Sequence, residues 1–396
     1  MKLKEGKDMN RLVKCGLENR IGSDCLKWDG LRERFGNEDL IAMWVADMDF
    51  KTPQPVIDAL KERVEHGIFG YHMIPDSYYE AFINWEKEKH GYDIKREWIR
   101  FSPGVVPALF WFINILTNPG DSCIVMGPVY YPFHHAIEEN NRKLIFNNLK
   151  NNNGIYTIDF ESFERDIIEN KVKLFILSSP HNPVGRVWTK EELKKVLDIC
   201  KANNVFVLSD EIHQDIIIGD KKQIPAATVG DYDNILVTLT AATKTFNLAA
   251  CQNSFVIIPD NKIRERFDEY FKSIGGDCGN IFGYIAVEAA YRYGEEWLNE
   301  ILAKIKENYE YTKEILSMYL PHVVISPLEG TYLAWYDFSY YINEKDIKNF
   351  FQDKCNLAVD YGSWFGEAGK GHIRINLATE RKIVEEAMNN IIKQLL

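Results

Sequence analysis

From about residue 100 onwards, short apolar runs alternate with stretches whose apolar residues recur at helical spacing. An apolar run of four to eight residues predicts a buried strand, whereas a spacing of three to four predicts a helix. Their alternation is typical of βαβ units around a mostly parallel sheet, so the predicted fold class is α/β. The predicted strands are Cys123–Pro128, Leu174–Pro180, Val205–Asp210, Ile235–Ala241 and Ser254–Pro259.

Three helical stretches accompany this pattern. The segment TKEELKKVLDICKANN, residues 189–204, predicts a helix with Thr189 as its N-cap. The run VVPALFWFINIL, Val105–Leu116, falls well short of the roughly 18 apolar residues that suggest a membrane span, so we expect a buried core helix. A long helix is expected over residues 295–320, and a final amphipathic helix from Glu380.

The order of these elements predicts two domains. A large domain with a mostly parallel sheet flanked by helices covers residues 50–290, and a smaller α+β domain combines residues 1–49 with residues 291–396. The chain has no internal repeat and no Pro-, Gly- or Ser-rich linker between the two parts. We therefore expect them to share an interface.

Composition limits the class of partner. A chain of 396 residues with 46% hydrophobic and 27% charged residues is typical of a soluble globular protein. Its net charge of −11 argues against nucleic acid or an anionic membrane as the main partner, because both usually require a basic face. We expect a small-molecule ligand instead.

The cysteines and the first residues bear on the compartment. Seven cysteines without a CxxC pair or a recurrent spacing favour reduced thiols over a disulfide framework or a metal site. The start, MKLKEGKDMNRLVKCG, lacks the apolar stretch of a signal peptide. We expect a cytoplasmic protein that holds no metal.

Ligands of open parallel sheets bind beyond the carboxyl ends of the strands, so the polar residues there are the candidates. Asp210 ends the strand VFVLSD, and Lys244 lies just beyond the strand ILVTLTA. Asn182 follows the strand LFILSSP, and Tyr130 follows CIVMGP. Taken singly, each has an ordinary structural explanation: a helix N-cap, a solvated lysine, an Asn-Pro turn and a packed aromatic ring.

The glycine turn in SPGVVPAL, residues 102–109, adds a possible phosphate site, because the first amides of a helix are free to bind an anion. A glycine turn, an aromatic ring, an Asn-Pro, an Asp and a Lys then follow one another on successive βα units. This order changes the interpretation, because several motifs keep their sequence and spacing together.

Over nearly its full length the chain resembles the class I/II aminotransferase superfamily, the fold-type I enzymes that use pyridoxal 5′-phosphate (PLP), and it is most similar to the cystathionine β-lyase, or C–S lyase, branch. The resemblance implies a PLP cofactor, an amino-acid substrate and a homodimer with active sites shared between subunits. The motifs that carry it are MWVADMDFKTPQPV (43–56), FGYHMIPDSYYEAFINW (69–85), SPGVVPAL (102–109), SSPHNPVGRVWTKEEL (178–193), LSDEIHQDI (208–216), TKTFNLAA (243–250) and GHIRINLA (371–378).

The resemblance assigns roles around the cofactor ring. Lys244 bonds covalently to the cofactor aldehyde and later removes the Cα proton of the substrate, for which burial must lower its pKa. Asp210 pairs with the protonated pyridine nitrogen. Asn182 and His213 bind the phenolic oxygen, unless His213 is merely a surface helix residue, and Tyr130 stacks on the ring.

Further roles concern the phosphate and the substrate. The amides of Val105 and Val106 and the hydroxyl of Thr243 bind the phosphate, and Tyr71 reaches it from the neighbouring subunit. Arg374, together with Asn182, binds the α-carboxylate of the substrate, in a bidentate geometry that Lys would not reproduce. A salt-bridged structural arginine is the alternative for Arg374.

Three positions depart from the pattern. Many aminotransferases have a phosphate-binding arginine at the position of Gln252. The lyase branch resembles this chain in lacking that arginine. Ala242 and Ala250 replace a proline and a glycine expected around the lysine in that branch. These changes bear on the shape of the site and on the substrate, and they leave Lys244 itself in place.

The expected reaction is α,β-elimination of L-cystathionine or a related β-thio amino acid to pyruvate, ammonia and a thiol. Transamination between an L-amino acid and a 2-oxo acid is the alternative, since it needs the same cofactor residues. A binding or regulatory protein that keeps the fold is a third hypothesis. Turnover separates it from the enzymes, because a binder may hold the cofactor and release no product. A nucleotide-binding enzyme finds no support, because neither GxGxxG nor GxxxxGK[ST] follows a strand.

Overall fold

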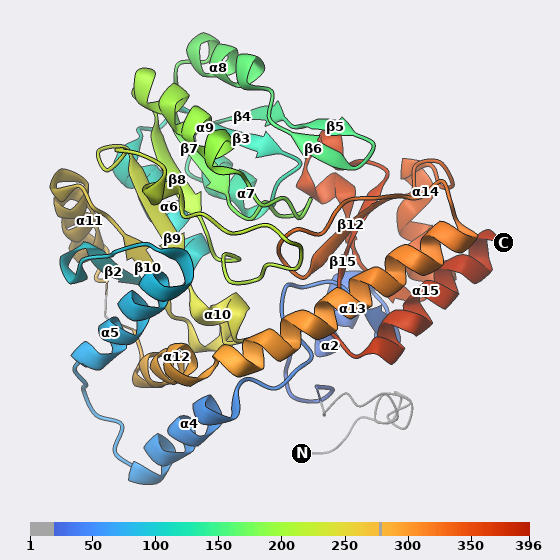
Figure 1. The fold of residues 1–396 in the computed structure, drawn as a ribbon, viewed down its shortest axis with the longest axis horizontal. Coiled ribbons are helices and arrows are strands. Elements are labelled where there is room, and N and C mark those ends of the chain that lie inside the picture. The colour runs from blue at the N-terminus through green and yellow to red at the C-terminus, as the bar shows by residue number, and fades with distance from the viewer. Residues whose placement is uncertain (1–19, 277–278) are drawn as a thin grey trace.

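The computed structural model describes residues 20–276 and 279–396 (Figure 1). Its largest element is a seven-stranded sheet with the strand order β2-β10-β9-β8-β7-β3-β4. Strand β10 runs antiparallel to both neighbours, and the remaining pairs are parallel. The strands are β2 (Ile99–Ser102), β3 (Ser122–Gly127), β4 (Lys143–Asn148), β7 (Val172–Ser178), β8 (Phe206–Asp210), β9 (Leu236–Thr240) and β10 (Ser254–Ile257).

The predicted mostly parallel α/β sheet is thus confirmed, and all five predicted strands form within about two residues of their expected bounds. The antiparallel direction of β10 and the edge strands β2 and β4 were not predicted. Strand β2 has only four residues, two of them half-buried, and β4 has one buried residue in six, so neither has the continuous buried apolar run that marked the central strands.

Alternate side chains of the central strands enter two different hydrophobic cores. Cys123 and Val125 of β3 pack with α6 (Val105–Leu116), α7 (Pro132–Glu139) and α11 (Asn261–Ser273). Ile124 and Met126 pack on the opposite face with α8 (Phe160–Glu169) and α9 (Lys190–Ala202). Because successive residues of a strand point to opposite faces, a strand buried on both faces is apolar throughout, which is why these runs could be recognised.

Two predicted helix features are confirmed. Helix α6 covers Val105–Leu116, the apolar run expected to form a core helix. In α9 the Oγ1 atom of Thr189 accepts a hydrogen bond from the Glu192 amide at 3.2 Å, and the Glu192 carboxylate accepts one from the Thr189 amide at 2.9 Å. This reciprocal pair satisfies two amides that the helix itself leaves without acceptors.

A third group of helices covers the β2–β10 end of the sheet. Helices α4 (Gln54–His66), α5 (Asp76–Trp85) and α12 (Ile281–Tyr293) lie there, and α5 continues as a π-helical turn, Glu86–His90. Shorter elements connect the layers. They are the strands β5 (Lys150–Asn152) and β6 (Ile155–Thr157), the helix α10 (Ala242–Thr245) and the one-turn helices Arg96–Trp98, Ala226–Thr228 and Ala249–Cys251.

A separate antiparallel sheet, in the order β11-β12-β15-β14, lies on the other side of the molecule (Figure 1). The 25-residue helix α13 runs past it from α12 towards the C-terminus, beside α15. The elements are β11 (Val324–Ile325), β12 (Leu333–Asp337), β14 (Asp360–Tyr361), β15 (His372–Asn376), α13 (Glu295–Tyr319), α14 (Glu344–Lys348) with the π-helical turn Asn349–Lys354, the one-turn helices Gly362–Phe365 and Glu367–Gly369, and α15 (Arg381–Leu395).

The N-terminal segment packs with this part of the molecule and adds a separate two-stranded sheet. Strand β1 (Ile41–Ala42) pairs in parallel with β13 (Leu357–Ala358), after the short helices α2 (Leu26–Asp29) and α3 (Leu31–Phe35). One hydrophobic core combines buried residues between 28 and 48 with residues from α13 to α15. This packing agrees with the expected composition of the small domain, although its bounds at 49 and 291 stay a prediction and residues 1–19 lie outside the described residues.

Candidate active site

The carboxyl ends of β7, β8, β9 and β2 lie at one edge of the large sheet. The register pairs Ser178 with Asp210, Asp210 with Leu239, and Ser254 of β10 with Ser102. The loops and helices that leave this edge carry nearly all the predicted site residues. They are Val105 and Val106 at the start of α6, Tyr130 after β3, Asn182 after β7, Asp210 and His213 at and after β8, and Thr243 and Lys244 in α10 after β9.

Lys244 is held by a neutral acceptor. Its Nζ atom donates a hydrogen bond to the carbonyl oxygen of Ala46 at 2.7 Å. Burial is the main reason that the pKa of Lys244 falls to about 8; nearby Arg374 also lowers it, whereas Asp47 and Asp210 raise it. The amine therefore exchanges its proton within the physiological pH range.

The Ala46 carbonyl belongs to a segment that is fixed from both sides of the site. Asn247, three residues after Lys244, donates to the carbonyls of Met48 and Phe50. Asn376, two residues after Arg374, donates to the carbonyls of Val45 and Asp47 at 2.7 and 2.6 Å. The motif that contains Lys244 and the motif that contains Arg374 thus each also contain an asparagine that positions this segment.

Asp210 and His213 are buried polar groups with few partners. The Asp210 Oδ1 atom accepts one hydrogen bond, from the Ile212 amide at 3.1 Å, and burial raises the pKa of Asp210 to about 7. The Nδ1 atom of His213 has no hydrogen-bond partner among the described residues, and burial together with Lys244 and Arg374 lowers the pKa of His213. Buried polar atoms in this condition are suited to a ligand that supplies their partners.

Arg374 connects the second sheet to this edge. Its Nη1 atom donates to Oδ1 of Asn182 at 2.8 Å, while Nε donates to Asp360 at 3.0 Å and Nη2 contacts the same carboxylate. The backbone carbonyl of Asn182 in turn accepts a hydrogen bond from the backbone amide of Tyr130 at 3.1 Å. The structure therefore brings Tyr130, Asn182 and Arg374 together.

The remaining predicted residues lie as follows. Val105, Val106 and Thr243 occupy the first turns of α6 and α10, where helix amides lack intrahelical acceptors. Tyr71 lies in the loop between α4 and α5 and is fully exposed, so one chain alone does not bring it to the other residues. Among the three departures, Ala242 is buried and Ala250 and Gln252 are exposed.

Several residues at the site were not predicted. Asp360 orients Arg374, and the hydroxyl of Tyr332 donates to the Ala46 carbonyl at 2.8 Å beside Lys244. Asn247 and Asn376 lie inside the motifs TKTFNLAA and GHIRINLA, so a closer look at those motifs could have found them. Asp360 and Tyr332 carry no local signal.

This arrangement agrees with the comparisons to known proteins. The family model described as "Aminotransferase class I and II" matches residues 38–391. The chain belongs to this family.

Three similar proteins indicate which members of the family this chain resembles. Cystathionine beta-lyase PatB of Bacillus subtilis (strain 168) is 39% identical over 94% of this chain and 97% of its own length. A PLP-bound protein of Clostridium difficile 630, provisionally named an aminotransferase, has a TM-score of 0.93 and 42% identity, covering 96% of this chain and 98% of its own. The PLP-bound C–S lyase of Staphylococcus hominis has a TM-score of 0.91 and 34% identity, covering 96% and 97%.

Two other classes of feature are not found in the part of the chain that the structure describes. No group of three His, Cys, Asp or Glu side chains there is arranged to hold a metal ion. No described helix combines the length and the apolar character needed to cross a bilayer.

A buried polar network lies directly behind the site of this family member. Asp215 accepts hydrogen bonds from Trp85 at 2.9 Å and from Thr245, the neighbour of Lys244, at 2.7 Å, and it pairs with His90 at 2.8 Å. Burial would lower the pKa of His90, but the Asp215 pair raises it to about 9. The network therefore ties α5 and its π-helical turn to the helix that carries Lys244.

Glu86 is the unusual member of this network. It is buried, its Oε1 atom accepts a hydrogen bond from Gln214 at 2.5 Å, and burial raises its pKa to about 8, against the opposing effect of His90. A carboxyl whose folded-state pKa lies above its unfolded value stabilises the fold fully below the unfolded pKa, and this contribution is lost as pH rises through the folded pKa. The window for Glu86 runs from about pH 4.5 to about pH 8.

We predict that Glu86→Gln removes this pH dependence, because the amide keeps the shape and the acceptor but does not titrate. The free energy of unfolding of the wild type, relative to the variant, should fall by roughly 4 kcal/mol between pH 5 and pH 9. Urea titrations at both pH values measure this difference. Glu88→Gln, at an exposed neighbouring position, is the control. A difference for Glu86→Gln that stays constant with pH would contradict the assignment.

Proposed function

We propose that this protein is a PLP-dependent C–S β-lyase, which converts L-cystathionine or a related β-thio amino acid into pyruvate, ammonia and a thiol. The observation that carries the proposal is the set Asn182, Asp210, Lys244 and Arg374 at one sheet edge, in a chain 39% identical to a cystathionine beta-lyase. One water is consumed as the Cα–H and Cβ–S bonds break.

The buried polar groups at the edge fit PLP. Asp210 is a buried carboxyl without a cation at contact distance among the described residues, and a protonated ring nitrogen would supply one. His213 has an unpartnered buried nitrogen, and the Nδ2 amide of Asn182 donates to no described group. Both can donate to a phenolic oxygen, and the first-turn amides of Val105 and Val106 with Thr243 suit a phosphate.

Bound PLP withdraws electrons from the Cα carbon of an amino acid and so acidifies its proton. Lys244 is the residue suited to accept that proton, because burial holds its pKa at about 8 and makes the neutral amine accessible. Asp210 would hold the proton at the ring nitrogen, and Tyr130 would cover a ring face. Arg374, oriented by Asp360, binds the α-carboxylate, and Asn182 steadies its Nη1 edge.

The same residues would serve transamination, which PLP also supports, with Lys244 again the group that would hold the transferred proton. Similarity to named C–S lyases at 34 and 39% identity therefore favours elimination. A binding protein that merely keeps the cofactor is less favoured, since a complete set of base, ring and carboxylate partners has a use only in turnover.

We predict that the PLP-loaded protein releases pyruvate from L-cystathionine without any added 2-oxo acid, as followed by a coupled lactate dehydrogenase assay. Lys244→Ala should lower kcat at least about 10³-fold, because it removes the base. Lys262→Ala, at an exposed lysine of α11, is the control. Wild-type turnover in Lys244→Ala, or amino transfer to a 2-oxo acid without pyruvate release, would overturn the proposal.

A homodimer is part of the proposal, because Tyr71 is suited to reach the cofactor phosphate of a neighbouring subunit. Ile68, Phe69, Tyr71 and Met73 expose most of their surface in one loop, and exposed apolar groups clustered in this way mark contact surfaces. We also propose a cytoplasmic location. The five described cysteines are unpaired, as is usual in a reducing compartment, whereas Cys15 and Cys278 lie outside the described residues.

We predict that the mass of the protein in solution, measured by sedimentation, is about twice the 46.0 kDa mass of the chain. Tyr71→Phe should leave this mass unchanged and weaken PLP retention about tenfold, because one phosphate hydrogen bond is lost. Analytical ultracentrifugation and equilibrium dialysis of PLP measure the two effects. A stable monomer with full activity would contradict the role of Tyr71.

A further inference from the structure

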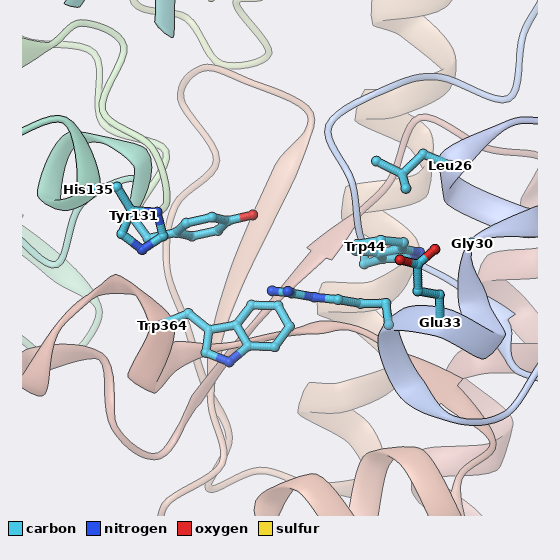
Figure 2. Close-up of a pocket in the computed structure, with 8 residues that line it drawn as sticks. Leu26, Gly30, Glu33, Trp44, Tyr131, His135 and Trp364 are labelled. Carbon is cyan, nitrogen blue, oxygen red and sulfur yellow. The ribbon is translucent and has the colours of Figure 1, made fainter. Parts of the chain in front are cut away.

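A pocket with a volume of about 580 Å³ opens beside the proposed active site (Figure 2). This volume lies in the range of pockets that hold small molecules. In Figure 2, Tyr131 and His135 form one side, Leu26, Trp44 and Glu33 the opposite side, and Trp364 lies between them. The lining residues are Leu26, Gly30, Glu33, Arg34, Trp44, Tyr131, His135 and Trp364.

The pocket adjoins the site at two of its walls. Trp44 is two residues before Ala46, whose carbonyl holds Lys244. Tyr131 follows Tyr130, and the centres of the two rings are 5.4 Å apart. The pocket wall thus includes close chain neighbours of two segments that line the proposed site.

A row of ring contacts leads from Arg374 to the far end of the pocket. The Arg374 guanidinium lies 4.9 Å from the ring centre of Phe365, which is 5.9 Å from Tyr131. Tyr131 is 6.2 Å from Trp364, and the Arg34 guanidinium lies 4.5 Å over the Trp364 ring. Burial raises the pKa of Tyr131, as does Asp360, and both Arg374 and Arg34 oppose this, so Tyr131 lies between the two cations.

The two charged side chains at the far end, Glu33 and Arg34, are exposed and form no ion pair with a described residue. No described carboxylate pairs with Arg34, which stacks on Trp364 instead, and Glu33 beside it has no ion pair with any described residue. The next arginine along the chain, Arg32, is by contrast paired with Glu38 at 3.0 Å. An unpaired cation and an unpaired carboxylate that line one pocket match a zwitterionic group of opposite polarity.

We propose that this pocket is the subsite for the leaving group of the substrate, and that it selects β-thioethers whose sulfur carries a second amino-acid end. Arg34 binds the distal carboxylate, Glu33 the distal ammonium, and the apolar walls of Leu26, Trp44 and Tyr131 cover the methylene groups and the sulfur. The inference rests on the proposed lyase function, because it takes Arg374 as the site of the α-carboxylate at the other end.

Three β-thio substrates of similar length separate the charges. L-Cystathionine has both distal charges, S-(3-carboxypropyl)-L-cysteine has the carboxylate alone, and S-propyl-L-cysteine has neither. The wild type should prefer the first to the last by at least about tenfold in kcat/KM. Arg34→Met, which keeps an apolar side chain, should lower this ratio about five- to tenfold, mainly through KM.

Glu33→Gln tests the other charge. It should lower kcat/KM for L-cystathionine relative to S-(3-carboxypropyl)-L-cysteine by about three- to fivefold, because only the former has a distal ammonium. Arg32→Met, on the same short helix but outside the pocket lining, is the matched control and should leave every ratio unchanged. Ratios in Arg34→Met equal to those of the wild type would overturn the subsite.

A binding measurement separates failure of the subsite from failure of the lyase proposal. PLP-loaded Lys244→Ala, titrated with L-cystathionine and S-propyl-L-cysteine by calorimetry, reports affinity without turnover. The subsite requires tighter binding of L-cystathionine, and Arg34→Met in the same background should remove the difference. Equal affinities would contradict the subsite, whereas unequal affinities without pyruvate release in the wild type would contradict the lyase reaction alone.

Discussion

The arrangement of the site depends on keeping the Lys244 amine buried without an ionic partner. Its hydrogen-bond acceptor is the neutral carbonyl of Ala46, and no carboxylate among the described residues lies within ion-pair distance of it. Desolvation of the ammonium is therefore only partly offset, by the more distant charges of Asp47 and Asp210, and the pKa of Lys244 falls to about 8.

The segment that supplies this carbonyl contains two acids, and the structure pairs both elsewhere. Asp47 forms an ion pair with Arg20 at 2.7 Å, and Asp49 pairs with Lys27 at 2.8 Å and with Arg20 at 3.0 Å. Without its pair with Arg20, Asp47 would present an unpaired carboxylate near Lys244 and favour the charged amine. The Arg20–Asp47 pair thus helps to set the basicity of a lysine more than 190 residues away in the chain.

Charge at the sheet edge follows the same logic. Asp210 has a raised pKa and no cation in contact among the described residues, while Arg374 is partly balanced by Asp360 and partly held by Asn182. Asp210, His213 and Lys244 face the site, whereas Gln214 and Thr245, the residues that follow His213 and Lys244, belong to the buried network behind it. A residue that faces the ligand site is thus followed directly by one that supports it from behind.

The sequence predicted what is local. Strands buried on both faces form continuous apolar runs, and their polar ends lie at one edge of any parallel sheet, so Asp210, Lys244 and Asn182 could be placed before their contacts were known. The Ala46 carbonyl, Asp360 and the subsite around Arg34 could not, because they depend on segments far apart in the chain whose approach no periodicity encodes. Tyr71 differs again, since its predicted role needs a second chain.

The central claim is that burial without an ionic partner sets the basicity of Lys244, and the most direct test is the pH dependence of its labelling by cyanate in the apoprotein. Peptide mass spectrometry would follow the initial rate at Lys244 and at the exposed Lys262. The account predicts a midpoint at about pH 8 for Lys244, well below that of Lys262. A common midpoint for the two lysines would contradict it.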